Sequence, residues 1–294
     1  RHYTNTMGAF SCTRDESIPV LSPVPPGLTS RRWEALLDIS GRVRDGVSLF
    51  QSVLGGGVAP EVRPVVWPFL LGCYPLESTS EQQEHAVTEC ESSLSSLTRQ
   101  LDSEGAASRF AEGGADEELA VAIRRISLDV ERTDPTLLSG DARTTFLGRL
   151  GRLLAAYALL DPEIGYCQGM SDLLAPFLML YPDDGRAFMC FRALMARVRG
   201  NFAQGQEPMM RQMATVMELV TRMDAPLGAH LHTIGAGDGV WSFRMLLVMM
   251  RREMAMQEVF SFWEVLWSGQ ALFGGTKALL PAVVATLMLE RRQQ

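Results

Sequence analysis

Apolar residues recur along most of this chain at the spacing of one face of an α-helix. Leu147, Leu150, Leu154 and Tyr157 stand at positions i, i+3, i+7 and i+10, which places them on one side of a helix. Comparable stretches cover residues 171–181, 186–199, 208–223, 239–252 and 259–268. No segment of useful length alternates apolar and polar residues, and no strand–helix–strand rhythm is present. The pattern therefore predicts an all-α protein whose helices are joined by short turns marked by glycine or proline.

Start and stop signals predict three helices in the first quarter of the chain. Residues 1–28 are polar and then rich in proline, without a period, so we expect an extended lead-in there. Thr29 or Ser30 can cap the first helix, and a second covers about residues 45–54 before a run of three glycines. Pro60 stands at a suitable first position for the third helix.

Residues 78–120 differ in composition from the rest of the chain. They are rich in Glu, Gln, Ser, Gly and Ala, and the part that contains Gly105, Gly113 and Gly114 shows no apolar period. Such a segment cannot bury enough apolar surface to offset the conformational entropy lost on ordering. We therefore expect a low-complexity, loose insertion here, mobile around residues 100–117, within a single helical domain that spans residues 29–294.

The overall composition is that of a globular protein with a slight acidic excess. Of the 294 residues 47% are hydrophobic, and 34 acidic against 27 basic side chains give a net charge of −7. This balance argues against nucleic acid as a partner, because phosphate binding needs clustered, uncompensated Lys and Arg. The apolar stretch at residues 265–289 contains Lys277 and Pro281, so we interpret it as core helices and not as a transmembrane segment.

Cysteine and histidine patterns indicate neither a metal site nor a disulfide framework. The five cysteines are scattered and odd in number, which favours reduced thiols in a cytoplasmic protein. His230 and His232 have no third ligand nearby, so no bound metal is expected. The glycines at residues 55–57 are not followed by the Lys-Ser/Thr pair of a phosphate-binding loop, which leaves a flexible turn as the expectation.

The first of two segments that stand out as candidate functional sites ends a predicted helix. Ile126, Asp129 and Arg132 are three residues apart and lie on one side of that helix. Pro135 disfavours helix at the residue before it, which places Arg132 at the helix end or just beyond. A guanidinium there can project outward while Asp129 steers it. Spacing alone favours a plainer alternative, a surface arginine paired with its i−3 aspartate.

The second segment covers residues 162–170. Tyr166 and Gln168 are two residues apart, so they are neighbours in an extended loop but not on a helix. Gly165 and Gly169 support such a loop, which leads into the next helix. A glutamine in this position could present its amide group to a water molecule, although the pair by itself is a weak signal.

Taken in order, these segments resemble the TBC domain, the catalytic domain of Rab GTPase-activating proteins. The three family motifs are present as RxxxW (Arg63, Trp67), IxxDxxR (Ile126, Asp129, Arg132) and YxQ (Tyr166, Gln168). The flanking residues 70–75, 132–134 and 166–172 match as well, and residues 243–247, 251–253 and 262–267 look like the family's C-terminal half. The resemblance covers about residues 29–275 and implies an all-helical, roughly V-shaped domain.

The resemblance also implies that the chain supplies two catalytic residues to a GTPase. In this scheme Arg132 stabilises the charge of the transition state, and Gln168 positions the attacking water in place of the GTPase's own glutamine. Asp129 orients and pairs with Arg132, while Tyr166 holds the loop and helps contact the GTPase.

The other motif residues are expected to have supporting roles. Ile126 is grouped with the supporting or GTPase-binding residues, Arg63 is assigned to the catalytic face with a largely structural role, and Trp67 is assigned to the core. The implied partner is a Rab-type small GTPase in its GTP-bound form. Because that partner carries GTP and Mg²⁺, no cofactor is expected on this chain. We expect a cytoplasmic monomer that reaches endomembranes only through partners or other domains.

Two alternatives remain beside the catalytic interpretation. One is a TBC-fold binding module that docks a small GTPase or an adaptor without accelerating hydrolysis. The other is a generic helical scaffold that matches the motifs by chance. Silent family members typically lack the arginine or the glutamine, and because Arg132 and Gln168 are both present, the sequence favours catalysis.

Overall fold

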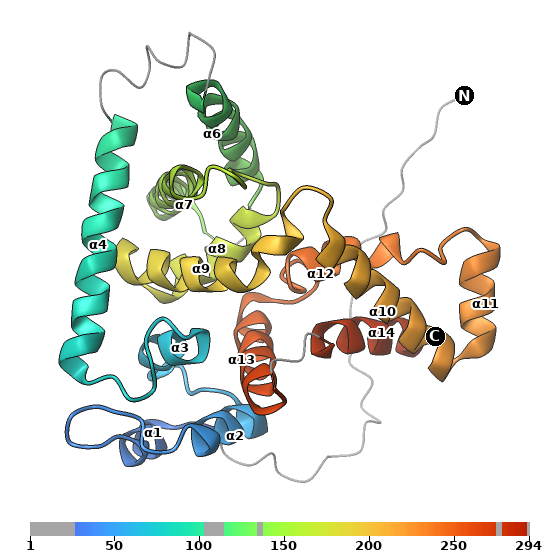
Figure 1. Ribbon diagram of the computed structural model, residues 1–294, viewed down its shortest axis with the longest axis horizontal. Coiled ribbons are helices and arrows are strands. Elements are labelled where there is room, and N and C mark those ends of the chain that lie inside the picture. Colours follow the sequence, from blue (N-terminus) through green and yellow to red (C-terminus); the bar gives the residue numbers. More distant parts are fainter. Residues whose placement is uncertain (1–26, 103–114, 134–137, 275–277, 293–294) are drawn as a thin grey trace.

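The computed structural model describes residues 27–102, 115–133, 138–274 and 278–292, which contain thirteen α-helices (Figure 1). In chain order these are α1 (Ser30–Leu36), α2 (Gly46–Gly56), α3 (Arg63–Leu71), α4 (Ser80–Asp102), α6 (Ala115–Arg132), α7 (Gly140–Leu160), α8 (Met170–Leu180), α9 (Asp184–Val198), α10 (Glu207–Met223), α11 (Ala225–Thr233), α12 (Phe243–Leu247), α13 (Met256–Leu272) and α14 (Leu279–Arg291), with short 3-10 helices η1 (Arg199–Asn201) and η2 (Val240–Ser242). Within the described ranges the only sheet-like pairing is two isolated bridges. The predicted all-α class is confirmed.

The first helices begin close to the residues that the sequence indicates. Thr29 and Asp45 accept hydrogen bonds from backbone N–H groups in the first turns of α1 and α2. The third helix starts at Arg63 and not at Pro60, because residues 60–62 form the turn before it. Leu28, expected in the lead-in, is fully buried, whereas residues 1–26 lie outside the described part of the chain.

The helices form two groups that meet at α13 (Figure 1). In the first group α6 packs on α7, α7 on α8 and α8 on α9, while α4 runs along the edge against α7 and α9. In the second group α10 packs on α11, α12 and α14. Because α13 contacts α2, α3, α8 and α14, it connects the two groups.

One hydrophobic core extends through both groups, and its centre is aromatic. Trp67 of α3 makes edge contacts with Phe177 of α8 and with Phe260 and Trp267 of α13, at ring-centroid distances of 5.0–5.5 Å. These contacts join segments of the chain that are distant in sequence. The prediction that Trp67 belongs to the core agrees with this position.

A buried carboxylate lies within the aromatic cluster. Oε1 of Glu264 accepts hydrogen bonds from Nε of Arg63 at 2.5 Å and from Nε1 of Trp67 at 2.8 Å. Its Oε2 accepts a third from the N–H of Val58 at 3.0 Å. These donors offset the cost of removing the charge from water. The RxxxW motif therefore holds α3 against α13.

The loose insertion expected at residues 78–120 is wrong for the part that forms α4. Val87, Cys90 and Leu94 are buried at positions i, i+3 and i+7 of this helix and face α9 and α7. A stripe of three apolar residues is diluted by the many polar ones around it, so the average composition conceals it. Residues 103–114, to which the expected mobility mainly refers, lie outside the described residues.

The single helix expected over residues 239–252 is also wrong. The α-helical part ends at Leu247, and the chain then turns with φ of +49° at Met249 and +63° at Met250. The carbonyl of Met249 accepts a hydrogen bond from Nε1 of Trp263 at 3.0 Å. Left-handed backbone is unfavourable for methionine, so tertiary contacts that local spacing does not reveal must hold this turn.

The apolar stretch at residues 265–289 is divided between α13 and α14. In the described part of the chain, no helix combines the length and the apolar character that crossing a bilayer requires.

Candidate functional site

The candidate site begins at the end of α6, where Arg132 occupies the last turn. Its Nε donates to the carbonyl of Leu128 at 3.1 Å, and its Nη2 donates to Oδ1 of Asp129. The side chain remains 67% exposed. Two contacts therefore hold one edge of the guanidinium while the rest of the side chain faces solvent.

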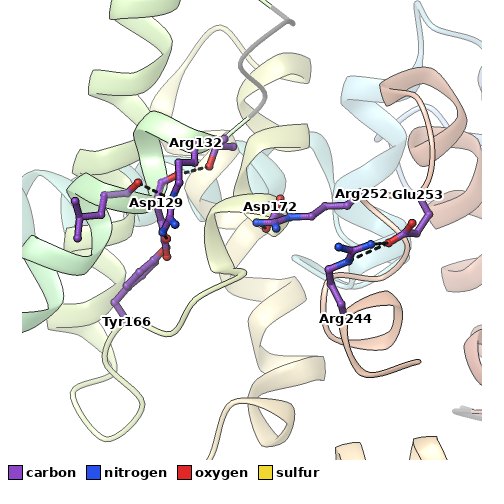
Figure 2. A network of polar contacts seen from close by, with 9 residues as sticks. Asp129, Arg132, Tyr166, Asp172, Arg244, Arg252 and Glu253 are labelled. Atoms are coloured by element: carbon purple, nitrogen blue, oxygen red, sulfur yellow. Dashed lines mark hydrogen bonds and ion pairs between the residues drawn. The ribbon is translucent and has the colours of Figure 1, made fainter. Parts of the chain in front are cut away.

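Asp129 connects this arginine to the loop after α7. Its Oδ1 accepts from Arg132, and its Oδ2 accepts from the hydroxyl of Tyr166 at 2.8 Å (Figure 2). Burial of Tyr166, together with the neighbouring carboxylate, raises the pKa of its hydroxyl. The phenol therefore stays protonated and remains a hydrogen-bond donor at physiological pH. With both oxygens engaged, the carboxylate has a fixed orientation, and so has the arginine that it pairs with.

The loop that carries Tyr166 and Gln168, residues 161–169, is held at its first residue. Asp161 accepts hydrogen bonds from Nε and Nη2 of Arg199 at 2.7 and 2.9 Å. These bonds keep the pKa of Asp161 below its ordinary value. The backbone N–H groups at Ile164 and Gly165 both donate to the Asp161 carbonyl, which folds the chain into a tight turn.

The loop is held again at its last residue, Gly169. The φ of this residue is +100°, a conformation that residues with a Cβ rarely adopt. A Cβ at this position would lie 3.1 Å from Cγ1 of Val248 and 3.5 Å from Cδ2 of Leu247. The glycine therefore lets the loop pack directly on the turn that follows α12. Gln168, the preceding residue, is exposed on a backbone fixed from both ends.

Arg132 and Gln168 line the same shallow hollow. Its volume is about 380 Å³, and its wall consists of Arg125, Leu128, Asp129, Arg132, Tyr166, Cys167 and Gln168. Burial raises the pKa of the Cys167 thiol, so this cysteine is no activated nucleophile. The hollow offers a permanent cation and a neutral amide. Such groups can stabilise charge and orient a water molecule.

The sequence of this chain matches a known protein family. The family model for the Rab-GTPase-TBC domain, RabGAP-TBC, matches residues 60–294. The chain belongs to the RabGAP-TBC family.

Individual relatives agree with this assignment. TBC1 domain family member 17 of Mus musculus is 32% identical over 284 residues, which cover 96% of this chain and 43% of that protein. The GTPase-activating protein gyp7 of Schizosaccharomyces pombe is 32% identical over 256 residues, which cover 82% of this chain and 34% of that protein. The chain thus spans less than half the length of these two relatives.

A solved structure shows the same fold. The crystal structure of the Ypt/Rab-GAP domain of Gyp1p superposes with a TM-score of 0.72 at 21% identity and covers 88% of this chain and 84% of that one. The RabGAP-TBC domain therefore has the helical architecture of that solved domain.

Besides Trp67, two motif residues of the RabGAP-TBC domain lie in its interior, away from the hollow. Arg63 is buried against Glu264, so its expected place on the catalytic face is wrong, while its expected structural role agrees with the buried ion pair. Ile126 is buried and faces Gly151 of α7, which makes it a support for α6 and not a contact for a partner. Tyr166 is buried as well, and its position suits holding the loop better than touching a GTPase.

Four charged residues beside the site lie in the flanking ranges that match the family, but sequence reasoning assigned them no role. Asp172, in the first turn of α8, accepts from Nε and Nη2 of Arg252 at 2.9 and 2.8 Å. Arg244 of α12 donates from Nε and Nη2 to Oε1 of Glu253 at 3.2 and 2.9 Å (Figure 2). One signal was available: Asp172 is the only charged residue in the apolar stretch at residues 171–181, and such a carboxylate needs a partner.

The RabGAP-TBC domain also has a larger hollow, of about 560 Å³, whose wall includes Leu194 of α9, Leu246 of α12 and Trp267 of α13. None of the motif residues lines it. The convergence of polar side chains, and not the size of the hollow, therefore selects the candidate site.

Proposed function

We propose that this domain accelerates GTP hydrolysis by a Rab-type small GTPase, to which it supplies Arg132 and Gln168. The observation that carries the proposal is that an exposed guanidinium and an exposed carboxamide, from two different elements, line one hollow. Family membership supports this class of activity, as does the name of one relative, a GTPase-activating protein.

Arg132 acts on the charge that develops during phosphoryl transfer. Hydrolysis of GTP passes through a loose transition state whose charge spreads over the phosphoryl oxygens and the leaving oxygen. A guanidinium is always charged and presents its donors as a planar fork. Supplied by a partner, it accelerates hydrolysis about 10³–10⁵-fold, or ~4–7 kcal/mol of barrier. The ion pair with Asp129 restricts the arginine before binding, which lowers the entropy lost when it enters the GTPase site.

Gln168 places the attacking water. A carboxamide can accept a hydrogen bond from the water and donate one to a phosphoryl oxygen. Because Asp161 and Gly169 hold the two ends of the loop, only the side chain has to become ordered when the GTPase binds. The geometry of the loop thus suits a residue that acts by orienting the attacking water.

The proposed partner brings the rest of the catalytic site. GTP and Mg²⁺ arrive on the GTP-bound GTPase, so the domain requires no cofactor of its own. We further propose that it acts as a cytoplasmic monomer at the membrane where its GTPase is anchored.

Single-turnover hydrolysis across a panel of Rab-type GTPases tests the proposal. The wild-type domain should accelerate at least one member, and Arg132→Ala and Gln168→Ala should each lose most of that acceleration. Binding of a GTP-bound GTPase without acceleration by the wild type would instead favour the silent docking module.

A further inference from the structure

Three arginine–carboxylate pairs lie among the polar contacts around the candidate site (Figure 2). They are Arg132 with Asp129, Arg252 with Asp172, and Arg244 with Glu253. Only the first belongs to one of the three short motifs. The arginines of the second and third come from α12 and the turn that follows it, on which the Gln168 loop packs, whereas Asp172 comes from α8.

The contacts between elements make the three pairs neighbours. The Tyr166 hydroxyl donates to Asp129, and the loop that carries Tyr166 leads directly into α8, whose first turn contains Asp172. Asp172 binds Arg252, and Arg252 precedes Glu253, which binds Arg244. In Figure 2 the three arginines lie one after another across the view, from Arg132 through Arg252 to Arg244.

In all three pairs the carboxylate is the more buried partner. Arg132, Arg252 and Arg244 are 67%, 43% and 61% exposed, whereas Asp129, Asp172 and Glu253 are 11%, 9% and 22% exposed. The surface pair Arg222–Glu218 on α10 is different, with exposures of 75% and 57%. At the candidate site the carboxylates lie behind the guanidinium groups and hold them outward.

This arrangement determines what kind of surface can dock here. The more exposed member of each of these three pairs is a cation, although the chain as a whole carries a net charge of −7 and Glu163, in the Gln168 loop, is an exposed carboxylate paired with Arg199. Cations held in place by buried carboxylates lose less conformational entropy on binding than free side chains do. A protein surface that presents Asp or Glu at matching positions is complementary to them.

We propose that Arg244 and Arg252 are docking residues for an acidic surface of the GTPase next to its nucleotide site. The inference rests on the proposed function, because the occupant of the surface is the GTPase that Arg132 and Gln168 serve. Arg244 contributes only to binding of the GTPase and has no positioning role. Arg252 also holds Asp172 in the first turn of α8, directly after the Gln168 loop, so it both docks and positions.

Binding and catalysis are measured separately to test the inference. The Arg132→Ala domain should bind a GTP-loaded GTPase from the panel, and its Kd should rise about 5- to 20-fold when Arg244→Glu is added at low salt. Arg244→Gln should give a smaller rise. Both effects should shrink towards none at about 0.5 M salt, because ions screen exposed charges. In the domain with Arg132 intact, Arg244→Gln should raise KM and change kcat much less.

Arg222→Glu is the matched control, because it reverses another exposed arginine that is paired with a glutamate and lies away from α6 and α8. It should leave Kd and KM unchanged. For Arg252, the lysine variant should retain most of the binding, while Arg252→Gln should raise KM and also lower kcat through the loss of the Asp172 contact. Thermal midpoints close to the wild-type value should accompany the Arg244 variants.

The outcomes separate this inference from the proposed function. If the wild-type domain accelerates a GTPase but Arg244→Glu changes neither Kd nor KM, the docking role is overturned and the catalytic proposal stands. If the wild type neither binds nor accelerates any member of the panel, the proposed function fails and the docking inference fails with it. Equal weakening by Arg244→Glu and Arg222→Glu would show a general charge effect and would also overturn the inference.

Discussion

Each of the two carboxylate oxygens of Asp129 accepts a hydrogen bond from a different donor, and single residues are therefore important at this site. The hydroxyl of Tyr166 occupies Oδ2, so Oδ1 is left to the guanidinium of Arg132. A carboxylate with only one partner could rotate and carry the arginine with it. Substitutions at Arg132 can test whether the planar set of guanidinium donors is needed in addition to the positive charge.

Replacing Arg132 by lysine should abolish most of the acceleration even though the charge is kept. Lysine is a point charge without the planar fork, so it cannot bridge the phosphoryl and leaving oxygens as a guanidinium does. We expect a loss of about 10³-fold or more, similar to that of Arg132→Ala. Single-turnover hydrolysis measures it. Because Arg132 is exposed, the thermal midpoint should stay near the wild-type value, and activity retained by the lysine variant would contradict the fork argument.

The role of Gln168 can be separated from that of the GTPase's own glutamine. A GTPase whose switch glutamine has been replaced should still be accelerated by the wild-type domain, because Gln168 can position the water in its place. The same GTPase should respond poorly to Gln168→Ala, and single-turnover hydrolysis measures both rates. The opposite result, acceleration that is lost with the GTPase's glutamine but survives Gln168→Ala, would leave a mechanism with one arginine only.

Among the elements, the loop at residues 161–169 depends most on its neighbours. Arg199 of η1 holds its start, and the turn after α12 lies against its end. Within the loop Tyr166 is buried in the core, and Ile164 and Cys167 pack against that core, so these contacts order the loop together with core packing. Two of its residues allow this dependence to be measured.

Gly169→Ala should lower activity more than Gly165→Ala. At Gly169 the φ of +100° is outside the usual left-handed region, and the added Cβ would press on Val248, so the Gln168 backbone must move. At Gly165 the φ is +59° and nothing lies within 4 Å of the added atom, so only a backbone cost of about 1 kcal/mol applies. Unfolding by urea and kcat measure the two effects, and equal activity in both variants would show that contact with Val248 is not what orders the loop.

The anchor at Asp161 should make stability depend on pH. The hydrogen bonds from Arg199 hold the pKa of Asp161 below its ordinary value of 3.8, so the charged form is favoured in the folded state. The contribution is therefore complete above the ordinary pKa and is lost as the pH falls through the lower folded value. Wild type should be more stable than Asp161→Asn at about pH 6, and the difference should close at about pH 3 or below. Urea midpoints measured across this range test the sign, and a constant difference would contradict it.

For the whole molecule, the buried pair of Arg63 and Glu264 has a role that periodicity does not reveal. It joins α3 to α13, and α13 in turn contacts both groups of helices. A charge in such a place is tolerated only because its partners satisfy it. Loss of one partner should therefore affect the entire fold.

Glu264→Ala should lower the free energy of unfolding by about 3–5 kcal/mol, because it leaves the Arg63 guanidinium buried without its carboxylate. The double variant Arg63→Met, Glu264→Leu should recover part of this loss, since apolar side chains need no counter-charge. Glu218→Ala, at an exposed pair on α10, should change stability by less than about 1 kcal/mol. Urea unfolding compares the three. If the double variant is less stable than Glu264→Ala, the two side chains stabilise the fold by more than compensating each other's charge.

Local physics was sufficient for most of the helices, whereas the two catalytic candidates also needed the resemblance to a known family. Caps at Thr29 and Asp45, the stripe along α7 and the helix end at Arg132 all follow from residues within a few positions of one another. The order of the three motifs then indicated the family. Where apolar residues were sparse, as in α4, the same local reasoning failed because packing against α9, and not composition, stabilises the helix.

Only the tertiary structure decided which charges meet. Asp172 and Arg252 are 80 residues apart in sequence, and Arg63 and Glu264 are 201 apart. The helical period says that such a carboxylate lies on an apolar face, but it cannot say which arginine reaches it. The same holds for the left-handed turn at Met249 and Met250, whose strain is offset by contacts from other elements. The sequence by itself determined most of the helices and the positions of the motif residues because these depend on neighbours along the chain. The arginine surface beside them depends on neighbours in space.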